Sequence, residues 1–298
     1  MFPIIPANSV AASAGNSEGI FGFGGTAGWT AVTSLVSNAG VISSDVAGVG
    51  TAREALAACE YGGDKGIFGY GTIAGVDKSI TNLVSNTGVV ATDTAGVGTA
   101  RRYSAACGYG EDKGIFGYGY PETAVTNLVS NAGVVATDTA GVGTTRQAPA
   151  ACEYGDDKGI FGFGLSGGST RIAITNLVSN AGVVATDTAG VGTTRAFIAA
   201  CGYGEDKGIF GYGLSASNVS MTNLVSNAGV VSSDVTGVGT ARRSLAATQY
   251  DGDKGIFGYG TISGDTAISN LVSNAGVVAS DVAGVGIARR YVGACSFN

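Results

Sequence analysis

The sequence lacks histidine altogether and is poor in several other residue types. Among its 298 residues are no His, one Trp, four Pro and only 13% charged residues. Without His there is no imidazole base, no Ser-His-Asp or Cys-His arrangement, and no ordinary zinc or copper ligand set. The sequence therefore predicts no catalytic residues, no metal site and no cofactor, and we expect a protein that is not an enzyme.

Positive charge and long apolar runs are scarce as well. The formal net charge is −6, so the basic stripe with which a nucleic-acid binder meets phosphates is missing. No apolar run approaches the ~20 residues needed to cross a bilayer. The first residues, MFPIIPANSVAASAG, lack the basic start of a signal peptide. We expect no nucleic-acid partner, no membrane span and no signal peptide.

Glycine, by contrast, is abundant. The chain has 52 Gly without a three-residue period, which excludes collagen, and 45% hydrophobic residues, which argue against disorder. Many Gly together with Val, Ile, Thr and aromatic residues are typical of short strands joined by tight turns.

One unit of about 47 residues recurs six times, which is the main observation. Each unit carries KGIFGYG or a close variant, then NLVSNAGVV, D-x-x-GVG, an Arg and a run of small residues such as Ala57-Ala58-Cys59. The repeated Asp and Arg positions are Asp45, Asp93, Asp138, Asp187, Asp234 and Asp281, with Arg53, Arg101, Arg146, Arg195, Arg242 and Arg289.

Each unit divides into four strand-like segments. In the second unit they are residues 53–61, 65–71, 79–86 and 89–97, joined by turns rich in Asn, Asp and Gly. Four short strands repeated six times predict an all-β, six-bladed β-propeller with four-stranded blades. The small residues suit the innermost strand, and Ile, Phe and Tyr of IFGYG suit the packing between blades.

The ends of the sequence predict how the ring closes. The chain begins with the second segment of a unit and ends with a first segment, so we expect the C-terminal strand to complete the first blade. This makes residues 16–298 a single propeller domain and leaves residues 1–15 as an N-terminal arm, which either covers part of the ring or reaches a neighbouring subunit.

The order of these residues resembles Kelch-type propellers. Arg53, Ala57-Ala58, residues 67–71 (IFGYG) and the next Arg101 follow the Kelch order, although GYG replaces the double Gly and the outer-strand Trp is absent. The near-identical copies are also similar to repeats of predicted phage structural proteins and surface proteins of uncultured microbes. That resemblance implies an extracellular or virion setting, and a cytoplasmic location stays open.

Two enzyme classes on such propellers are disfavoured. Copper oxidases of the Kelch type need His ligands. Sialidases use a cluster of Arg and carboxylates with a Tyr, but here the six Arg occupy equivalent positions, and the Asp-box pattern is missing. We expect the repeated Arg and Asp to be structural, with each Arg bracing a Gly-rich connection by hydrogen bonds.

The remaining polar repeats have structural interpretations, each with an alternative. Cysteines occur at one blade position, with Thr248 in the sixth copy, and we interpret them as small buried residues rather than disulfides or metal ligands. Adjacent Asp-Lys pairs such as Asp64-Lys65 fit a solvated rim, with weak Ca²⁺ binding as the alternative. Asn218 begins the only N-glycosylation sequon. The cysteines are Cys59, Cys107, Cys152, Cys201 and Cys295.

Two windows vary within this uniform repeat. One is the link between the second and third strands, and the other is the triplet after each Arg, so both should lie on one face around the channel mouth. We predict that this variable face binds a partner, with neutral drift in exposed loops as the alternative. Its candidate residues are Trp29, Arg102, Tyr103, Tyr120, Arg171, Phe197, Arg243, Arg290 and Tyr291.

These observations predict a non-catalytic structural or interaction protein. We expect a subunit of an extracellular or virion assembly that contacts a protein partner or further copies of itself. The alternative is a soluble, lectin-like propeller with several equivalent glycan sites between blades, where avidity replaces single-site affinity.

Overall fold

The computed structural model describes residues 19–297 and consists of strands and turns throughout this range. It contains six three-stranded antiparallel sheets and one two-stranded ribbon. Among these residues no helix is long and apolar enough to cross a membrane. The all-β class predicted from the repeat is confirmed, and the predicted arm at residues 1–15 lies outside the described residues.

Each sheet corresponds to one repeat. The first sheet holds β1 (Gly19–Gly25), β2 (Trp29–Val36) and β20 (Gly293–Ser296), and the second holds β3 (Ala57–Tyr61), β4 (Lys65–Gly69) and β7 (Thr81–Val84). The third holds β8 (Ala105–Tyr109), β9 (Lys113–Gly117) and β10 (Thr126–Val129), and the fourth β11 (Ala150–Tyr154), β12 (Lys158–Ser166) and β13 (Thr170–Val178). The fifth holds β14 (Ala199–Tyr203), β15 (Lys207–Gly211) and β16 (Thr222–Val225), and the sixth β17 (Ala246–Tyr250), β18 (Lys254–Gly258) and β19 (Ser269–Val272). The ribbon pairs β5 (Thr72–Ile73) with β6 (Val76–Asp77).

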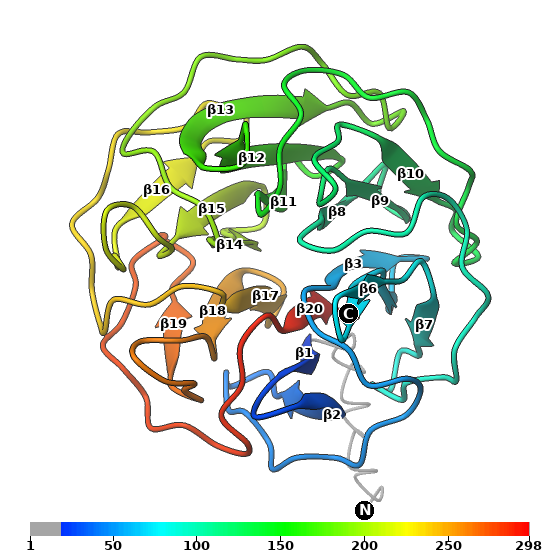
Figure 1. Ribbon diagram of the computed structural model, residues 1–298. Helices are drawn as coiled ribbons and strands as arrows, with labels where there is room; N and C mark the ends of the chain where they lie inside the picture. Colours follow the sequence, from blue (N-terminus) through cyan, green and yellow to red (C-terminus); the bar gives the residue numbers. More distant parts are fainter. Residues whose placement is uncertain (1–18, 298) are drawn as a thin grey trace, which may run out of the picture.

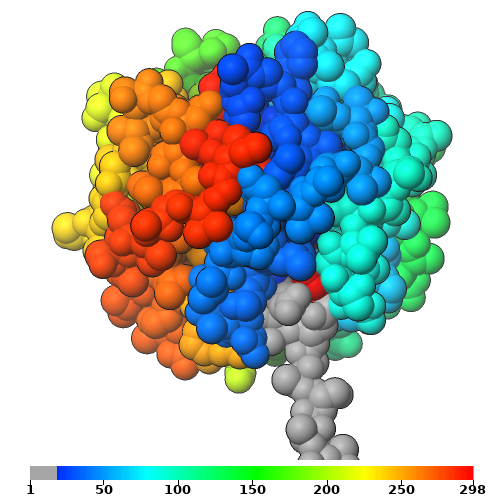
Figure 2. All heavy atoms as spheres, turned by 90° about the horizontal axis from the view of Figure 1, so that it is seen from below, coloured from blue at the N-terminus to red at the C-terminus, as the bar shows by residue number. Residues whose placement is uncertain are grey.

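The two ends of the chain meet in the first sheet. β20 pairs antiparallel with β1, joining Gly19 to Ser296 and Phe21 to Ala294, as the order of segments in the sequence predicts. Figure 2 shows the blue N-terminal strands between the red end of the chain and the cyan second repeat.

The six sheets surround a common centre (Figure 1), and the first strand of each repeat lies nearest to it. These strands contact one another in the cyclic order β3, β8, β11, β14, β17, β20 and again β3. Small residues at this position make the approach feasible, because six strands converge where large side chains would collide. The ring of six alanines there is Ala58, Ala106, Ala151, Ala200, Ala247 and Ala294.

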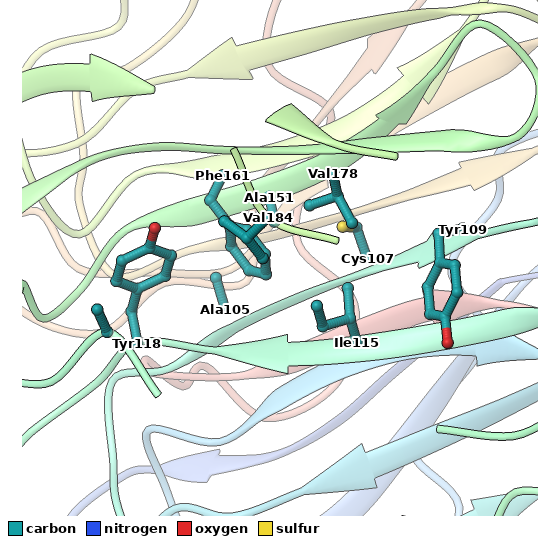
Figure 3. Packing of buried hydrophobic residues seen from close by; sticks show 10 residues of the cluster. Ala105, Cys107, Tyr109, Ile115, Tyr118, Ala151, Phe161, Val178 and Val184 are labelled. Atoms are coloured by element: carbon teal, nitrogen blue, oxygen red, sulfur yellow. The ribbon is translucent and has the colours of Figure 1, made fainter. Parts of the chain in front are cut away.

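The core lies between neighbouring sheets. Phe161 of the fourth sheet packs edge-on against Tyr118 of the third, with ring centroids 5.2 Å apart, and Ile115 and Val178 complete the cluster (Figure 3). A Cβ at Gly117 would lie 2.8 Å from the Phe161 ring, so this position of the repeat requires glycine. Each repeat therefore buries its aromatic residues against the next one.

The predicted fourth strand is the main correction. Residues 89–97 form no strand, and their backbone pairs with the third strand only at the isolated bridges Thr81–Thr94 and Val84–Val90. Side chains replace the missing backbone ladder: Asn82 donates to the Ala91 carbonyl and to the Asp93 carboxylate. The Gly-rich stretch that follows lacks side chains for a pleated surface and serves as the connection to the next repeat.

Candidate functional sites

The six repeated arginines are completely buried between sheets. Each guanidinium stacks on an aromatic ring of the preceding repeat, as Arg101 does on Tyr70 at 4.0 Å. The aromatic residue lies between two glycines and has a left-handed backbone conformation, with φ of 65° at Tyr70. Arg101 also donates to the Thr99 carbonyl (3.2 Å) and to Asn127 Oδ1 (2.7 Å). Burial lowers the pKa of Arg53 and of Arg195 to about 10. These contacts occupy the guanidinium groups within the chain, so the six arginine side chains do not face a ligand.

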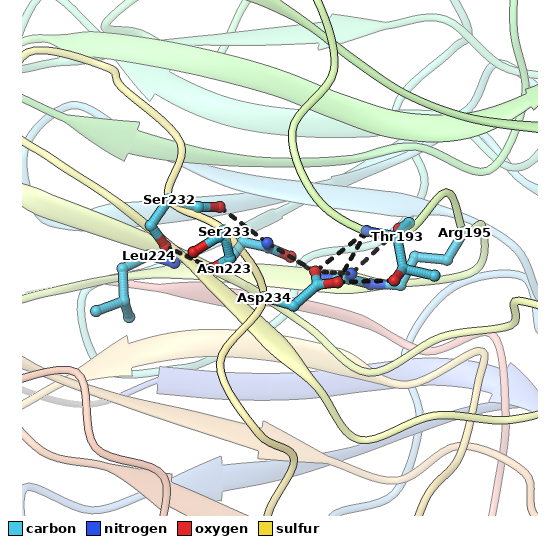
Figure 4. Close-up of polar contacts among 7 residues, drawn as sticks. All are labelled: Thr193, Arg195, Asn223, Leu224, Ser232, Ser233 and Asp234. Atoms are coloured by element: carbon cyan, nitrogen blue, oxygen red, sulfur yellow. Dashed lines mark hydrogen bonds and ion pairs between the residues drawn. The ribbon is translucent and has the colours of Figure 1, made fainter.

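The repeated aspartates join each repeat to the one before it. Asp234 accepts hydrogen bonds from the Thr193 amide, from Thr193 Oγ1 (2.7 Å) and from Asn223 Nδ2 (3.0 Å), with Arg195 Nη1 at 3.4 Å (Figure 4). We call this arrangement the aspartate latch. It recurs for the pairs Thr51–Asp93, Thr99–Asp138, Thr144–Asp187 and Thr240–Asp281.

The latch controls the ionisation of its carboxylates. Burial would raise the pKa of Asp234, but the hydrogen bonds from Thr193 and Asn223 outweigh it and hold the pKa below its ordinary value. The same balance lowers the pKa of Asp93, Asp138, Asp187 and Asp281. The sixth junction is different, because Asp45 accepts only from the Ile287 amide (2.7 Å) and from Ser34 Oγ (2.9 Å).

A closed ring of backbone hydrogen bonds encircles the centre at one end. It runs through the second residue after each repeated Arg, with each amide donating to the carbonyl of the preceding repeat at 2.8–3.2 Å. All six residues have positive φ, between 52° and 57°. They are Ala55, Tyr103, Ala148, Phe197, Ser244 and Tyr291.

Three of these residues close the channel with their rings. The centroid of Tyr103 lies 5.5 Å from that of Phe197 and 5.2 Å from that of Tyr291, and Phe197 lies 6.0 Å from Tyr291. Large and small residues thus alternate around the ring, since only three aromatic side chains fit at the axis. Beneath them the alanine ring lines a cavity of about 110 Å³. Tyr103 and Tyr291 therefore act with Phe197 as an axial plug.

The opposite end of the channel is polar and shows the reverse alternation. Glu60, Glu153 and Gln249 are its long side chains, and the repeats between them carry Gly108, Gly202 and Ser296. Ser296 Oγ donates to Glu60 Oε2 at 2.6 Å. Burial, the charge of Glu60 and a hydrogen bond to Glu60 raise the pKa of Glu153 well above its usual range. Sequence reasoning missed this group, although the alternation after each small-residue run is visible in the repeat.

The two variable windows lie against one another, as isolated bridges such as Arg102–Tyr120 and Arg243–Thr261 show. Internal contacts occupy most of the candidate partner residues there. Arg102 pairs with Asp77 at 2.8 Å and stacks on Tyr120 at 4.2 Å, whereas Arg290 pairs with Asp265 at 2.9 Å.

The other candidates on this face are less engaged. Arg243 donates to Asn218 Oδ1 at 3.1 Å, and Arg171 is partly exposed in β13. Trp29 and Tyr120 are 43% and 39% exposed. Among the nine predicted residues, these two aromatic side chains are the most open to a partner.

The most regular exposed apolar feature lies elsewhere, in the turn after the third strand. The valine that ends each Ser-Asn-Ala/Thr-Gly-Val sequence is 62–66% exposed, and we call this set the valine rim. The sequence predicts these turns from their Asn and Gly, but not the exposure of the valine. The rim consists of Val41, Val89, Val134, Val183, Val230 and Val277.

The rim borders apolar grooves between neighbouring repeats. One groove, of about 190 Å³, is lined by Leu177 and Val191 of the fourth repeat and by Ala228 and Val230 of the fifth. An equivalent groove of the same volume lies one repeat further, at Leu224 and Val277. The same groove thus occurs at two successive junctions between repeats.

The cysteines and the Asp-Lys pairs take structural positions. All five cysteines are free and buried, and burial raises the pKa of Cys201 to about 12. Lys158 Nζ lies 2.5 Å from Asp157 Oδ1, and Asn180 Nδ2 donates to Asp157 Oδ2 at 2.9 Å. Within residues 19–297 no group of three or more His, Cys, Asp or Glu side chains is placed to hold a metal ion.

No protein-family model matches this chain, and a comparison with curated proteins finds no match.

Proposed function

We propose that the six sheets are the blades of a β-propeller whose ring is closed by β20, in a Kelch-like arrangement. The cyclic contacts of the first strands, the ring of six backbone hydrogen bonds and the β1–β20 pairing support this architecture. Each blade has three strands and a bridged outer segment in place of a regular fourth strand.

On this fold we propose a non-catalytic structural protein that assembles through its outer rim into an extracellular or virion particle. One observation carries the proposal: a valine stays 62–66% exposed at the same place in all six repeats, while the windows at the other face have diverged. Contiguous exposed apolar surface marks sites of association with other proteins, and the rim valines Val230 and Val277 each line an apolar groove. The buried Arg and Cys repeats are accounted for by blade packing, and the repeated Asp by the latch between blades.

A lectin-like role has weaker support. Equivalent grooves between blades would suit multivalent binding, but those described above are lined by Leu, Val, Ala, Gly and Thr. A sugar site needs convergent polar groups that fix its hydroxyls. The chemistry of the grooves thus favours apolar side chains of a protein.

The test is the size of the particle in solution. We expect the intact chain to form particles far larger than its 29.2 kDa, and replacement of all six rim valines by serine to dissociate them without altering the far-ultraviolet spectrum. Val76→Ser is the matched control, because Val76 is 57% exposed but lies in a variable link. A wild-type chain that stays monomeric at micromolar concentration would refute self-assembly, and a glycan array would then test the lectin alternative.

A further inference from the structure

The grooves between blades are small, apolar and open. Each groove of about 190 Å³ is lined by a leucine and valines, including a rim valine of the next repeat. An apolar protein cavity of about 150 Å³ accommodates a benzene molecule. One groove therefore has room for an aromatic or branched aliphatic side chain, and not for a larger ligand.

Gly19, to which the first 18 residues are joined, lies on the side of the ring that carries these grooves. Gly19 pairs with Val36, which immediately precedes the turn that ends in the rim valine Val41. In the other repeats the same turn is tied to the hairpin between the first two strands, as by Asn86 Nδ2 and Asp64 Oδ2 at 3.0 Å. Eighteen extended residues span up to about 60 Å, which is enough to reach a neighbouring molecule.

The sequence of this segment matches the grooves chemically. It starts MFPIIP and carries one charged side chain, Glu18, so Phe2, Ile4 and Ile5 can enter an apolar site without burying charge. Pro3 and Pro6 restrict φ and favour an extended backbone, which lowers the entropy lost on binding.

We propose that residues 1–18 of one copy bind an inter-blade groove beside the valine rim of a second copy. This inference rests on the proposed self-assembly and specifies the two surfaces that join one copy to the next. The segment and the groove are different surfaces, so the contact is heterologous. Copies joined by it form an open filament unless the rotation between successive copies closes a ring.

The experiment uses three full-length variants and sedimentation velocity. The segment variant carries Phe2→Ser, Ile4→Ser and Ile5→Ser, the groove variant carries the six rim Val→Ser changes, and the control carries Ser9→Ala and Ser13→Ala. We expect the segment and groove variants each to need at least tenfold higher concentration to assemble than the wild type, and the control to behave as the wild type. Mixed together, the segment and groove variants should form small complexes, because each supplies the half that the other lacks.

The possible results separate the two proposals. A segment variant that assembles like the wild type, while the groove variant does not, would overturn the segment contact and leave rim-mediated assembly standing. Two defective variants that form no complex when mixed would likewise overturn the contact between copies. A wild-type chain that remains monomeric would remove self-assembly and the segment contact together.

Discussion

The sixth latch can be completed by one substitution, Ile287→Thr. In five junctions a threonine donates both its amide and its hydroxyl to the aspartate of the next repeat, as Thr144 does to Asp187 with an Oγ1–Oδ2 distance of 2.6 Å. At the junction between the last and first repeats only the Ile287 amide reaches Asp45. Ile287 is 48% exposed, so a smaller polar side chain is tolerated there.

The expected gain follows from this geometry. A hydrogen bond to a carboxylate contributes about 1.5–3 kcal/mol where it is sheltered, and roughly 1 kcal/mol at an exposed site such as this one. Replacing Ile by Thr removes a methylene and exchanges a methyl group for the hydroxyl, so two half-buried apolar carbons are lost, or about 0.8 kcal/mol. This loss nearly cancels the hydrogen bond in a comparison with Ile, so the isosteric Ile287→Val is the reference that isolates the bond. We therefore expect the free energy of unfolding of Ile287→Thr to exceed that of Ile287→Val by about 1 kcal/mol, and Thr144→Val to lower it by about 1 kcal/mol relative to the wild type.

Urea unfolding followed by far-ultraviolet circular dichroism measures these variants, supported by thermal melts. For a chain of this size 1 kcal/mol corresponds to a change in Tm of about 2–4 °C. If Thr144→Val destabilises the protein but Ile287→Thr is no more stable than Ile287→Val, the closing junction is not built like the others. The absence of a difference in both comparisons would refute the latch as a source of stability.

Other measurements test the remaining groups. The latch aspartates have lowered pKa values, so their stabilisation is complete above the unfolded pKa of about 3.9 and is lost as pH falls further; constant stability down to pH 2 would contradict this. The pKa of Glu153 is raised in the folded protein, so this group destabilises the protein as pH rises above the pKa that it has in the unfolded chain. Glu153→Gln, which copies Gln249, should therefore stabilise the protein at pH 7 and lose that advantage near pH 4, and an advantage independent of pH would exclude ionisation as its cause. The buried thiols should react with a disulfide reagent only at the rate of unfolding; rapid labelling of the native protein would show that they are accessible.

The repeat length and the turn residues predict much of the fold. Asn-Ala-Gly and Gly-Glu-Asp at fixed offsets specify tight turns, and the strands between them appear within a few residues of their expected positions. The prediction of a fourth strand is wrong because residues 89–97 are rich in β-branched residues but form only a few backbone hydrogen bonds with the third strand. Side-chain bonds from Asn82 and the latch hold much of the rest, which no local propensity reveals.

The site was less predictable because its residues are defined by contacts across repeats. Arg102 and Asp77 are 25 positions apart, yet they form an ion pair between neighbouring repeats. The residue types at these two variable positions are therefore matched to one another, and exposure alone does not account for them. The partner-binding role of this face stays a prediction. The exposure of the rim valines could not be predicted for a different reason: whether a valine in a turn is exposed depends on how the turn meets the next repeat.

The axis explains why some positions differ in a repeat that is otherwise uniform. Six aromatic residues cannot meet at one point, and six carboxylates would repel one another at the other end, so each ring alternates between large and small side chains. Blades with an aromatic residue at the plug, such as that of Tyr103, carry a small residue at the polar end, here Gly108. Blades with a small residue at the plug, such as that of Ala148, carry Glu153. The alternation therefore gives both ends of the six-repeat arrangement an approximate three-fold axis, and two adjacent repeats form its smallest complete unit.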